Sequence, residues 1–147
     1  MTTIAYRDGV VATDTLSTSG NIVYDRCHEK RLLIRGATFW LCGNNAEAET
    51  FANRILDGVR FEKEGYDCDG LALIGDKLYN CGHSEGTYYK SEMTSGFWAW
   101  GSGAEIAMGA MQMNATSEQA ITIASQIDVF TGGEVRKYNA RTGERIS

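Results

Sequence analysis

The stretch TTIAYRDGVVATD, residues Thr2–Asp14, decides which fold we expect for this chain. It holds two short β-prone runs, Thr2–Tyr6 and Val10–Asp14, on either side of Arg7-Asp8-Gly9. An Asp-Gly pair between two such runs is a strong signal for a tight hairpin turn. The sequence therefore predicts that the chain opens with a two-stranded hairpin, which starts at a threonine and ends at an aspartate.

Beyond this hairpin, strand-like runs continue around further turn signals. We expect turns at Gly20-Asn21, Arg35-Gly36-Ala37 and Gly75-Asp76, and two more strands at Phe97–Trp100 and Glu134–Tyr138. Most of the β-structure should therefore consist of antiparallel hairpins.

Three segments carry helical signals. Behind Gly43-Asn44-Asn45, apolar residues recur at helical spacing as far as Gly58, which is a natural helix stop. A second helix is expected over about Gly103–Met113. The third opens with the capping-box pattern Thr116–Gln119, and we expect Gly132-Gly133 to end it. Strands and helices in this order predict an α+β sandwich of stacked layers.

Length and charge restrict the classes of function. The chain has 147 residues, which fits one domain over residues 1–147. Its net charge is −5 and its Lys and Arg residues are scattered, so nucleic acid and anionic membrane are not expected partners. No run approaches the roughly 20 apolar residues of a membrane span, and the N-terminus lacks a signal-peptide pattern. We therefore expect a cytoplasmic protein.

The cysteines do not predict a metal centre. Cys27, Cys42, Cys68 and Cys81 form no CxxC pair, and the spacing of Cys68 and Cys81 with His83 matches no common zinc framework. In the cytosol all four thiols should stay reduced. We expect no metal and no cofactor.

Thr2 offers a nucleophile with its own base. It follows Met1 and is small enough for methionine aminopeptidase to expose it as the N-terminal residue. A free α-amine titrates at about pH 8, so it can take the proton of the threonine hydroxyl. One residue can thus supply both the nucleophile and the general base.

The chain resembles proteasome β-subunits, and more closely the HslV-type peptidases. Thr2–Asp14 looks like the opening hairpin of that family, and the segment CHEKRL, residues 27–32, looks like the one that carries its lysine. Gly101-Ser102-Gly103 matches a turn before a helix, and DVFTGG, residues 128–133, resembles an Asp-x-x-Ser-Gly-Gly segment. The resemblance covers nearly the whole chain. It implies a four-layer αββα sandwich of the N-terminal-nucleophile hydrolase class, as a single β-subunit-like domain.

The resemblance also implies roles for individual residues. Thr2 would attack the substrate, Lys30 would lower the pKa of the α-amine and steady the alkoxide, and Asp14 would orient Lys30. A polar net around the α-amine and the attacking water would be formed by Ser102, Asp128 and Thr131. Substrate-binding positions would be Thr18, Gly20 and Trp40.

The implied function is that of an N-terminal-threonine endopeptidase, which hydrolyses peptide bonds through an acyl-enzyme on Thr2. Peptides or unfolded proteins would be the substrates, the subunits would form a homo-oligomeric ring, and an ATP-dependent unfoldase is a possible partner by analogy. The oxyanion donor would be a backbone N–H.

Three features depart from the family pattern. Trp40 aligns with the family's oxyanion glycine, Val59–Asp69 is too short for a second long helix, and Met1 blocks the amine while it persists. One helical layer should therefore be shortened.

Alternative interpretations stay open. Asp14 can simply start a turn, Lys30 can be a solvated charge, and Ser102 can serve only its tight turn. Asp128 and Thr131 can be polar residues at a helix end. A non-catalytic structural or assembly protein with the same fold is the main alternative, and an amidase for small amides is another.

Overall fold

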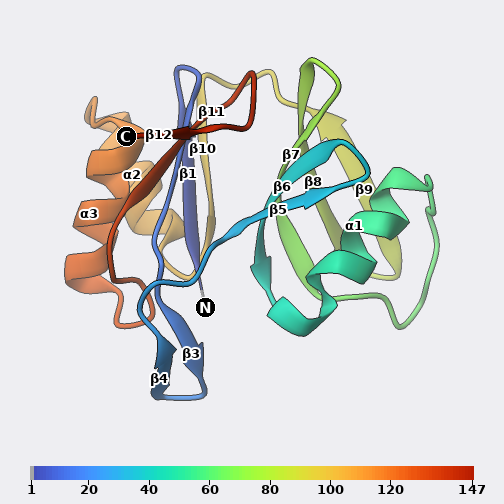
Figure 1. Cartoon of the computed structure of the whole chain (residues 1–147), viewed down its shortest axis with the longest axis horizontal. Helices are drawn as coiled ribbons and strands as arrows, with labels where there is room; N and C mark the ends of the chain where they lie inside the picture. The colour runs from blue at the N-terminus through green and yellow to red at the C-terminus, as the bar shows by residue number, and fades with distance from the viewer. Residues whose placement is uncertain (1) are drawn as a thin grey trace. The chain divides into compact units, whose positions relative to one another are not determined.

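The computed structural model describes residues 2–147, which form two compact units (Figure 1). The first unit combines the residues up to Lys30 with Ser95–Ser147, and the second is Arg31–Thr94. None of the helices in residues 2–147 has the length and apolar composition needed to span a bilayer.

The predicted opening hairpin forms the centre of the first unit. Strands β1 (Thr3–Arg7) and β2 (Val10–Thr13) pair antiparallel, and Asp8 and Gly9 both have positive φ angles of 50° and 82°. Positive φ at both central residues is the geometry of a type I′ turn, which matches the twist of the flanking strands. The Asp-Gly signal therefore predicted both the hairpin and its turn correctly.

Three further strands extend this sheet, which has the order β10-β1-β2-β11-β12. These strands are β10 (Phe97–Gly101), β11 (Arg136–Asn139) and β12 (Arg145–Ile146). A separate two-stranded sheet contains β3 (Ser17–Ser19) and β4 (Ile22–Asp25), joined at the predicted Gly20-Asn21 turn. The five-stranded sheet is antiparallel throughout.

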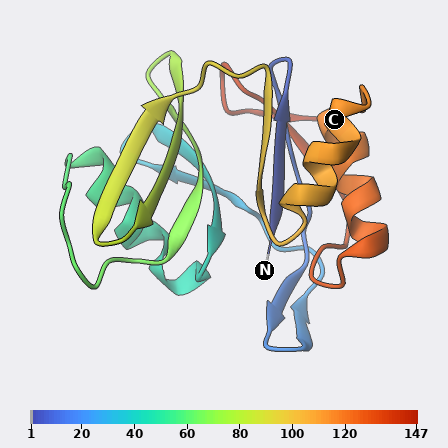
Figure 2. The same ribbon diagram turned by 180° about the vertical axis from the view of Figure 1, so that it is seen from behind.

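Two helices cover one face of the five-stranded sheet, as Figure 2 shows from behind: α2 (Ala104–Gln112) and α3 (Ser117–Ile127). Small side chains dominate the core between helices and sheet, so the two layers can approach closely. Its buried members are Ala5, Ala12, Ala99, Ala107, Met111, Ala120 and Ile121.

The start of α3 agrees with the sequence, whereas its end does not. Thr116 and Gln119 form both bonds of the predicted capping box. The helix stops at Ile127 rather than at Gly132-Gly133, because Asp128 adopts an extended conformation and its carboxylate accepts the Phe130 N–H at 3.1 Å. A local side-chain hydrogen bond of this kind competes with continued helix.

The second unit contains an antiparallel five-stranded sheet and one α-helix. The sheet has the order β5-β6-β7-β8-β9, with strands Arg31–Ile34, Ala37–Gly43, Cys68–Ile74, Lys77–Ser84 and Thr87–Glu92. A short 3₁₀ helix, η1 (Asn45–Glu47), is capped by Asn44 and leads into α1 (Ala48–Leu56). Phe39, Phe51 and Tyr88 are the aromatic members of the core beneath α1.

Each unit supplies one five-stranded sheet and one helical layer, so the predicted α+β fold is confirmed. The helical layer of the first unit has two helices, and that of the second has a single nine-residue α-helix and one 3₁₀ turn. The predicted shortening of one layer is therefore observed. That residues 1–147 form a single domain stays a prediction.

Candidate active site

Lys30 lies against Thr2 inside the first unit. Its Nζ donates a hydrogen bond to Thr2 Oγ1 and another to the Leu16 carbonyl oxygen at 2.7 Å. Only 2% of the Lys30 side chain is exposed, and Thr2 is also buried. An ammonium group has donors only, so Thr2 Oγ1 must accept from Lys30 and its own hydrogen stays available for a base.

Asp14 supplies the opposite charge. One carboxylate oxygen lies 3.7 Å from Lys30 Nζ, and the two oxygens accept the main-chain N–H groups of Thr3 at 3.2 Å and Gly132 at 3.1 Å. Burial raises the pKa of Asp14 above its usual value, and the charge of Lys30 and the two N–H groups oppose that rise. A charged Asp14 in this position balances the buried cation.

The segment before Lys30 is tied to the rest of the unit by contacts that the sequence did not indicate. Thr15 Oγ1 donates to the Arg26 carbonyl at 2.9 Å, and the His28 N–H donates to the Thr15 carbonyl at 2.8 Å. Glu29 accepts hydrogen bonds from the Tyr138 hydroxyl and, at 3.1 Å, from Arg136. The Thr15 bonds join residues 11 and 13 positions apart, and the Glu29 bonds join residues more than 100 positions apart, so no local pattern could have revealed them.

A second polar cluster is centred on Asp128. Its Oδ2 accepts the hydroxyls of Ser102 at 2.5 Å and Thr131 at 2.6 Å, and its Oδ1 accepts the Phe130 N–H. Burial raises the pKa of Asp128, but these hydrogen bonds to the charged form outweigh it and hold the pKa below its usual value. Asp128 is therefore a well-stabilised carboxylate.

The Gly-Ser-Gly turn connects this cluster to Thr2. The Ser102 N–H donates to the Thr2 carbonyl oxygen at 3.1 Å. A Cβ atom on Gly101, whose φ is 101°, would lie 1.6 Å from that same oxygen, and one on Gly103 would lie 2.6 Å from Thr3 Oγ1. Both glycines are therefore required by the close approach of the N-terminal strand.

The structure thus brings the six predicted catalytic residues into two clusters that both touch the start of β1. Thr2, Asp14 and Lys30 form one cluster, and Ser102, Asp128 and Thr131 form the other. Thr3, which the sequence analysis did not select, contacts both. Their catalytic roles stay predictions.

The three predicted substrate-binding residues lie outside these clusters. Thr18 lies in β3 and is half-buried, and Gly20 is exposed in the β3–β4 turn with φ of 59°. Trp40 belongs to the second unit, in the middle of β6, and is completely buried. Their contact with substrate also stays a prediction.

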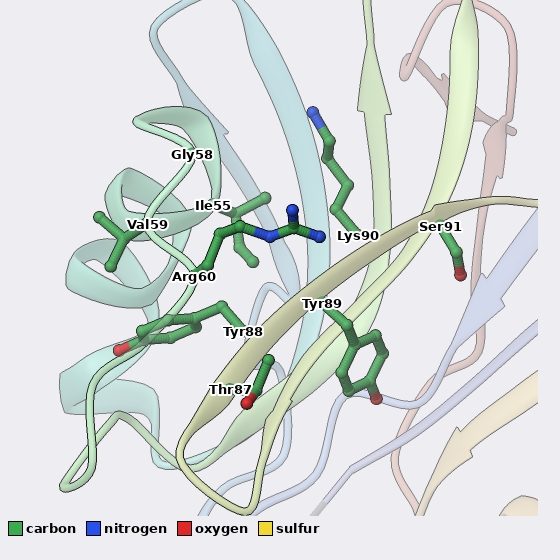
Figure 3. Close-up of a pocket in the computed structure, with 9 residues that line it drawn as sticks. All are labelled: Ile55, Gly58, Val59, Arg60, Thr87, Tyr88, Tyr89, Lys90 and Ser91. Atoms are coloured by element: carbon green, nitrogen blue, oxygen red, sulfur yellow. The ribbon is translucent and has the colours of Figure 1, made fainter.

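A separate pocket of about 330 Å³ lies in the second unit, between the end of α1 and β9 (Figure 3). Its lining residues all fall between Ile55 and Ser91, so it does not include the two clusters.

Within residues 2–147, no three His, Cys, Asp or Glu side chains gather in a way that could hold a metal ion.

Comparisons with known proteins give little at the level of sequence. No protein-family model matches the chain. An alpha-xylosidase from Emericella nidulans is 30% identical over 71 residues, which cover 48% of this chain. The chain spans only 9% of the length of that protein, so the match carries no statement about activity.

Solved structures give a much stronger match. Thiobacillus denitrificans BPH in complex with epoxomicin is 19% identical, with a TM-score of 0.68 over 93% of this chain and 96% of that one. Eukaryotic HslV from Trypanosoma brucei is 16% identical, with a TM-score of 0.69 over 94% of this chain and 98% of that one. The resemblance predicted from the sequence is therefore confirmed at the level of the fold: the chain has the HslV- and proteasome-type fold of the N-terminal-nucleophile hydrolases.

Proposed function

We propose that this protein is a threonine-type peptidase in which Thr2, freed of the residue before it, is the nucleophile. One observation carries the proposal: the buried ammonium of Lys30 donates a hydrogen bond to the hydroxyl oxygen of Thr2, with Asp14 as its counter-charge. A buried lysine is costly unless it is paired, and packing alone does not require it beside a threonine hydroxyl. Such a contact suits a group that must carry negative charge during a reaction.

In the first step, the α-amine of Thr2 takes the hydroxyl proton and Oγ1 attacks the carbonyl carbon of the scissile peptide bond. The tetrahedral oxyanion is stabilised by a backbone N–H. When the intermediate collapses, the C–N bond breaks and the leaving amine takes the proton from the α-amine. An ester between Thr2 and the acyl part of the substrate results.

In the second step, water attacks this ester. The α-amine accepts a proton from the water, the C–O bond to Thr2 breaks, and the proton returns to Oγ1 as the acid product leaves. Lys30 stabilises the developing alkoxide in both steps. Asp128, held ionised by Ser102 and Thr131, would orient the α-amine and the attacking water.

Substrate and assembly follow from the same proposal. Peptides or unfolded proteins would lie along strand edges near Thr18–Gly20. A homo-oligomeric ring in the cytoplasm is proposed by analogy with HslV- and proteasome-type proteins, and so is an ATP-dependent unfoldase as partner. The complex of the Thiobacillus denitrificans protein with epoxomicin makes that compound a suitable probe.

The test combines intact mass with covalent labelling. The mass of the purified protein should show that Thr2 is N-terminal, and epoxomicin should add one molecule to Thr2. Thr2→Ala should abolish labelling and peptide cleavage, and Lys30→Ala should lower both by at least about 100-fold, the scale of losing one electrostatic stabiliser. Lys77→Ala is the matched control, because it removes a lysine that is half-exposed and whose Nζ lies as far as 4.0 Å from a carboxylate oxygen of Glu92.

The opposite result would favour the non-catalytic alternative. A folded protein that keeps a residue before Thr2 and is not labelled by epoxomicin would be a structural or assembly protein with this fold. Equal cleavage rates for wild type and Thr2→Ala would lead to the same conclusion.

A further inference from the structure

Thr3 is the residue that touches both polar clusters. Its main-chain N–H donates to Asp14 at 3.2 Å, and its carbonyl oxygen accepts the Asp14 N–H at 3.3 Å. Its hydroxyl lies 2.6 Å from Thr131 Oγ1 and accepts the Gly103 N–H at 2.9 Å. The whole residue is inaccessible to solvent, with 0% exposure.

The hydrogen positions in this chain of hydroxyls follow from counting donors. Thr131 has one hydroxyl hydrogen, which it donates to Asp128 Oδ2. Thr131 must therefore accept from Thr3. Because the Thr3 hydrogen is then used, its remaining bond is the one that it accepts from the Gly103 N–H. A single direction thus runs from a main-chain amide through two hydroxyls to the carboxylate.

We propose that Thr3 is a positioning residue for the active site, which links the Asp14–Lys30 pair to the Asp128 cluster and holds the Thr2 main chain between them. The proposal rests on the function proposed above. Thr3 itself does not touch the reacting atoms.

Strand geometry explains how one residue can do this. Thr2 directly precedes β1, and successive side chains along an extended chain alternate in direction. The two neighbouring hydroxyls accordingly have different partners: Thr2 Oγ1 contacts Lys30, and Thr3 Oγ1 contacts Thr131. The Ser102 N–H holds the Thr2 carbonyl oxygen between them. A shift of Thr3 would therefore move Thr2 relative to both clusters.

A purely structural role needs only a β-branched side chain, which valine would supply as well as threonine. The chain offers a matched control for this alternative. Thr13 on the neighbouring strand is equally buried at 0% exposure, and its hydroxyl has no hydrogen-bond partner within residues 2–147. Thr13→Val therefore makes the same chemical change without touching the link.

The kinetic test compares Thr3→Val, Thr3→Ser and Thr13→Val. Peptide cleavage is measured and kcat is divided by the fraction of Thr2 that epoxomicin labels, so that misfolded protein does not count. Thr3→Val should lower this kcat by about 10- to 100-fold, the scale of a small misplacement of a reacting group, with KM changed less. Thr3→Ser keeps the hydroxyl and should stay within about threefold of wild type, and Thr13→Val within about twofold.

Two kinetic results would overturn the proposal. One is a kcat per labelled site in Thr3→Val that equals the wild-type value. The other is an equal loss in Thr3→Ser and Thr3→Val, because keeping the hydroxyl would then give no advantage over removing it.

Amide hydrogen exchange tests the link without requiring activity. Thr3→Val should accelerate exchange of the Gly103 amide, which loses its acceptor, and also of the Phe130 amide, which is bonded to Asp128. Thr3→Ser should protect both, and the Tyr88 amide of the second unit, bonded to the Arg60 carbonyl, is the internal control. If Gly103 is unprotected in the wild type, or Phe130 is unchanged in Thr3→Val, the link is wrong even when Thr2 is catalytic. If exchange behaves as expected but Thr2 is never labelled, only the proposed peptidase function fails.

Discussion

Removing either member of the Asp14–Lys30 pair should be among the most destabilising changes in this protein. Their side chains are 1% and 2% exposed and 3.7 Å apart, so neither charge can be hydrated when its partner is lost. Loss of one partner from a buried pair typically costs about 3–5 kcal/mol. We expect Asp14→Ala and Lys30→Met each to lower the free energy of unfolding by this amount, out of a typical total of about 5–15 kcal/mol.

The double variant separates the pair from its surroundings. Once one charge is gone, removing the other relieves an unpaired buried charge, so Asp14→Ala with Lys30→Met should cost about as much as one single change. The interaction energy of the cycle should therefore equal about one single cost in magnitude, about 3–5 kcal/mol. The double variant should not recover wild-type stability, because the N–H groups of Thr3 and Gly132 lose their acceptor.

Urea unfolding, followed through the fluorescence of the three tryptophans, measures these free energies. The effect of Lys30→Met should also depend on pH. Burial raises the pKa of Asp14, and the positive charge of Lys30 opposes that rise. Without that charge, the pKa of Asp14 should be still higher in Lys30→Met. A carboxyl with a raised pKa contributes stability below its unfolded value of 3.8 and loses it as pH rises through the folded pKa. Lys30→Met should therefore be less destabilised at pH 5 than at pH 8.

Lys77→Met is the control, because its exposed pair with Glu92 should contribute only about 0–1 kcal/mol. Strict additivity of Asp14→Ala and Lys30→Met, or an equal cost at both pH values, would refute the reasoning. Either result would mean that the two side chains do not interact as a buried ion pair.

Three further predictions follow from single positions. Thr13→Val should stabilise the protein by about 1 kcal/mol in urea unfolding, because it removes a buried hydroxyl without a partner in residues 2–147, and a loss of stability would contradict this. Gly103→Ala should lower the free energy of unfolding by about 1–3 kcal/mol in the same assay, because its Cβ would meet Thr3 Oγ1 at 2.6 Å. Its control is Gly109→Ala at an exposed position in α2, which should raise the free energy of unfolding by up to about 1 kcal/mol. Equal effects of the two changes would show that helix propensity alone decides. Asp128→Asn should lower the stability of the protein above about pH 4. As the pH falls through the lowered folded pKa of Asp128, the stability of the variant and that of the wild type should become equal. A pH-independent difference between them in thermal unfolding would contradict this.

Local chemistry explains which parts of the fold could be predicted. The hairpins at Asp8-Gly9 and Arg35-Gly36 were readable because both residues of each turn adopt positive φ, which few side chains tolerate. The capping box at Thr116 was readable because its two bonds join residues three positions apart. The sequence analysis missed β9, although Glu85-Gly86 makes the same kind of turn before it. There the strand is mostly exposed and polar, so its hydrophobic pattern is weak.

The end of α3 was misplaced for a related reason. Glycines are common helix stops, but here Asp128 leaves the helix first because its carboxylate has partners in Ser102 and Thr131 as well as in the next turn. The pattern of apolar residues contains no information about such partners. Thr3 and Thr15 were passed over for the same reason, since a buried threonine in a strand looks like any other β-branched residue.

Most strands and helices, the turns between them and a short set of residues with suitable chemistry could be read from the sequence. Those properties depend on interactions between residues a few positions apart, which a linear pattern records. Folding in three dimensions was needed to direct the ammonium group of Lys30, 28 positions from Thr2, at the threonine hydroxyl rather than into solvent. Folding also joins Asp14, through Thr3, to residues that lie 100 and 128 positions from Thr3. Such contacts depend on how buried polar groups find partners once the chain has folded, because each donor or acceptor left without one would cost free energy.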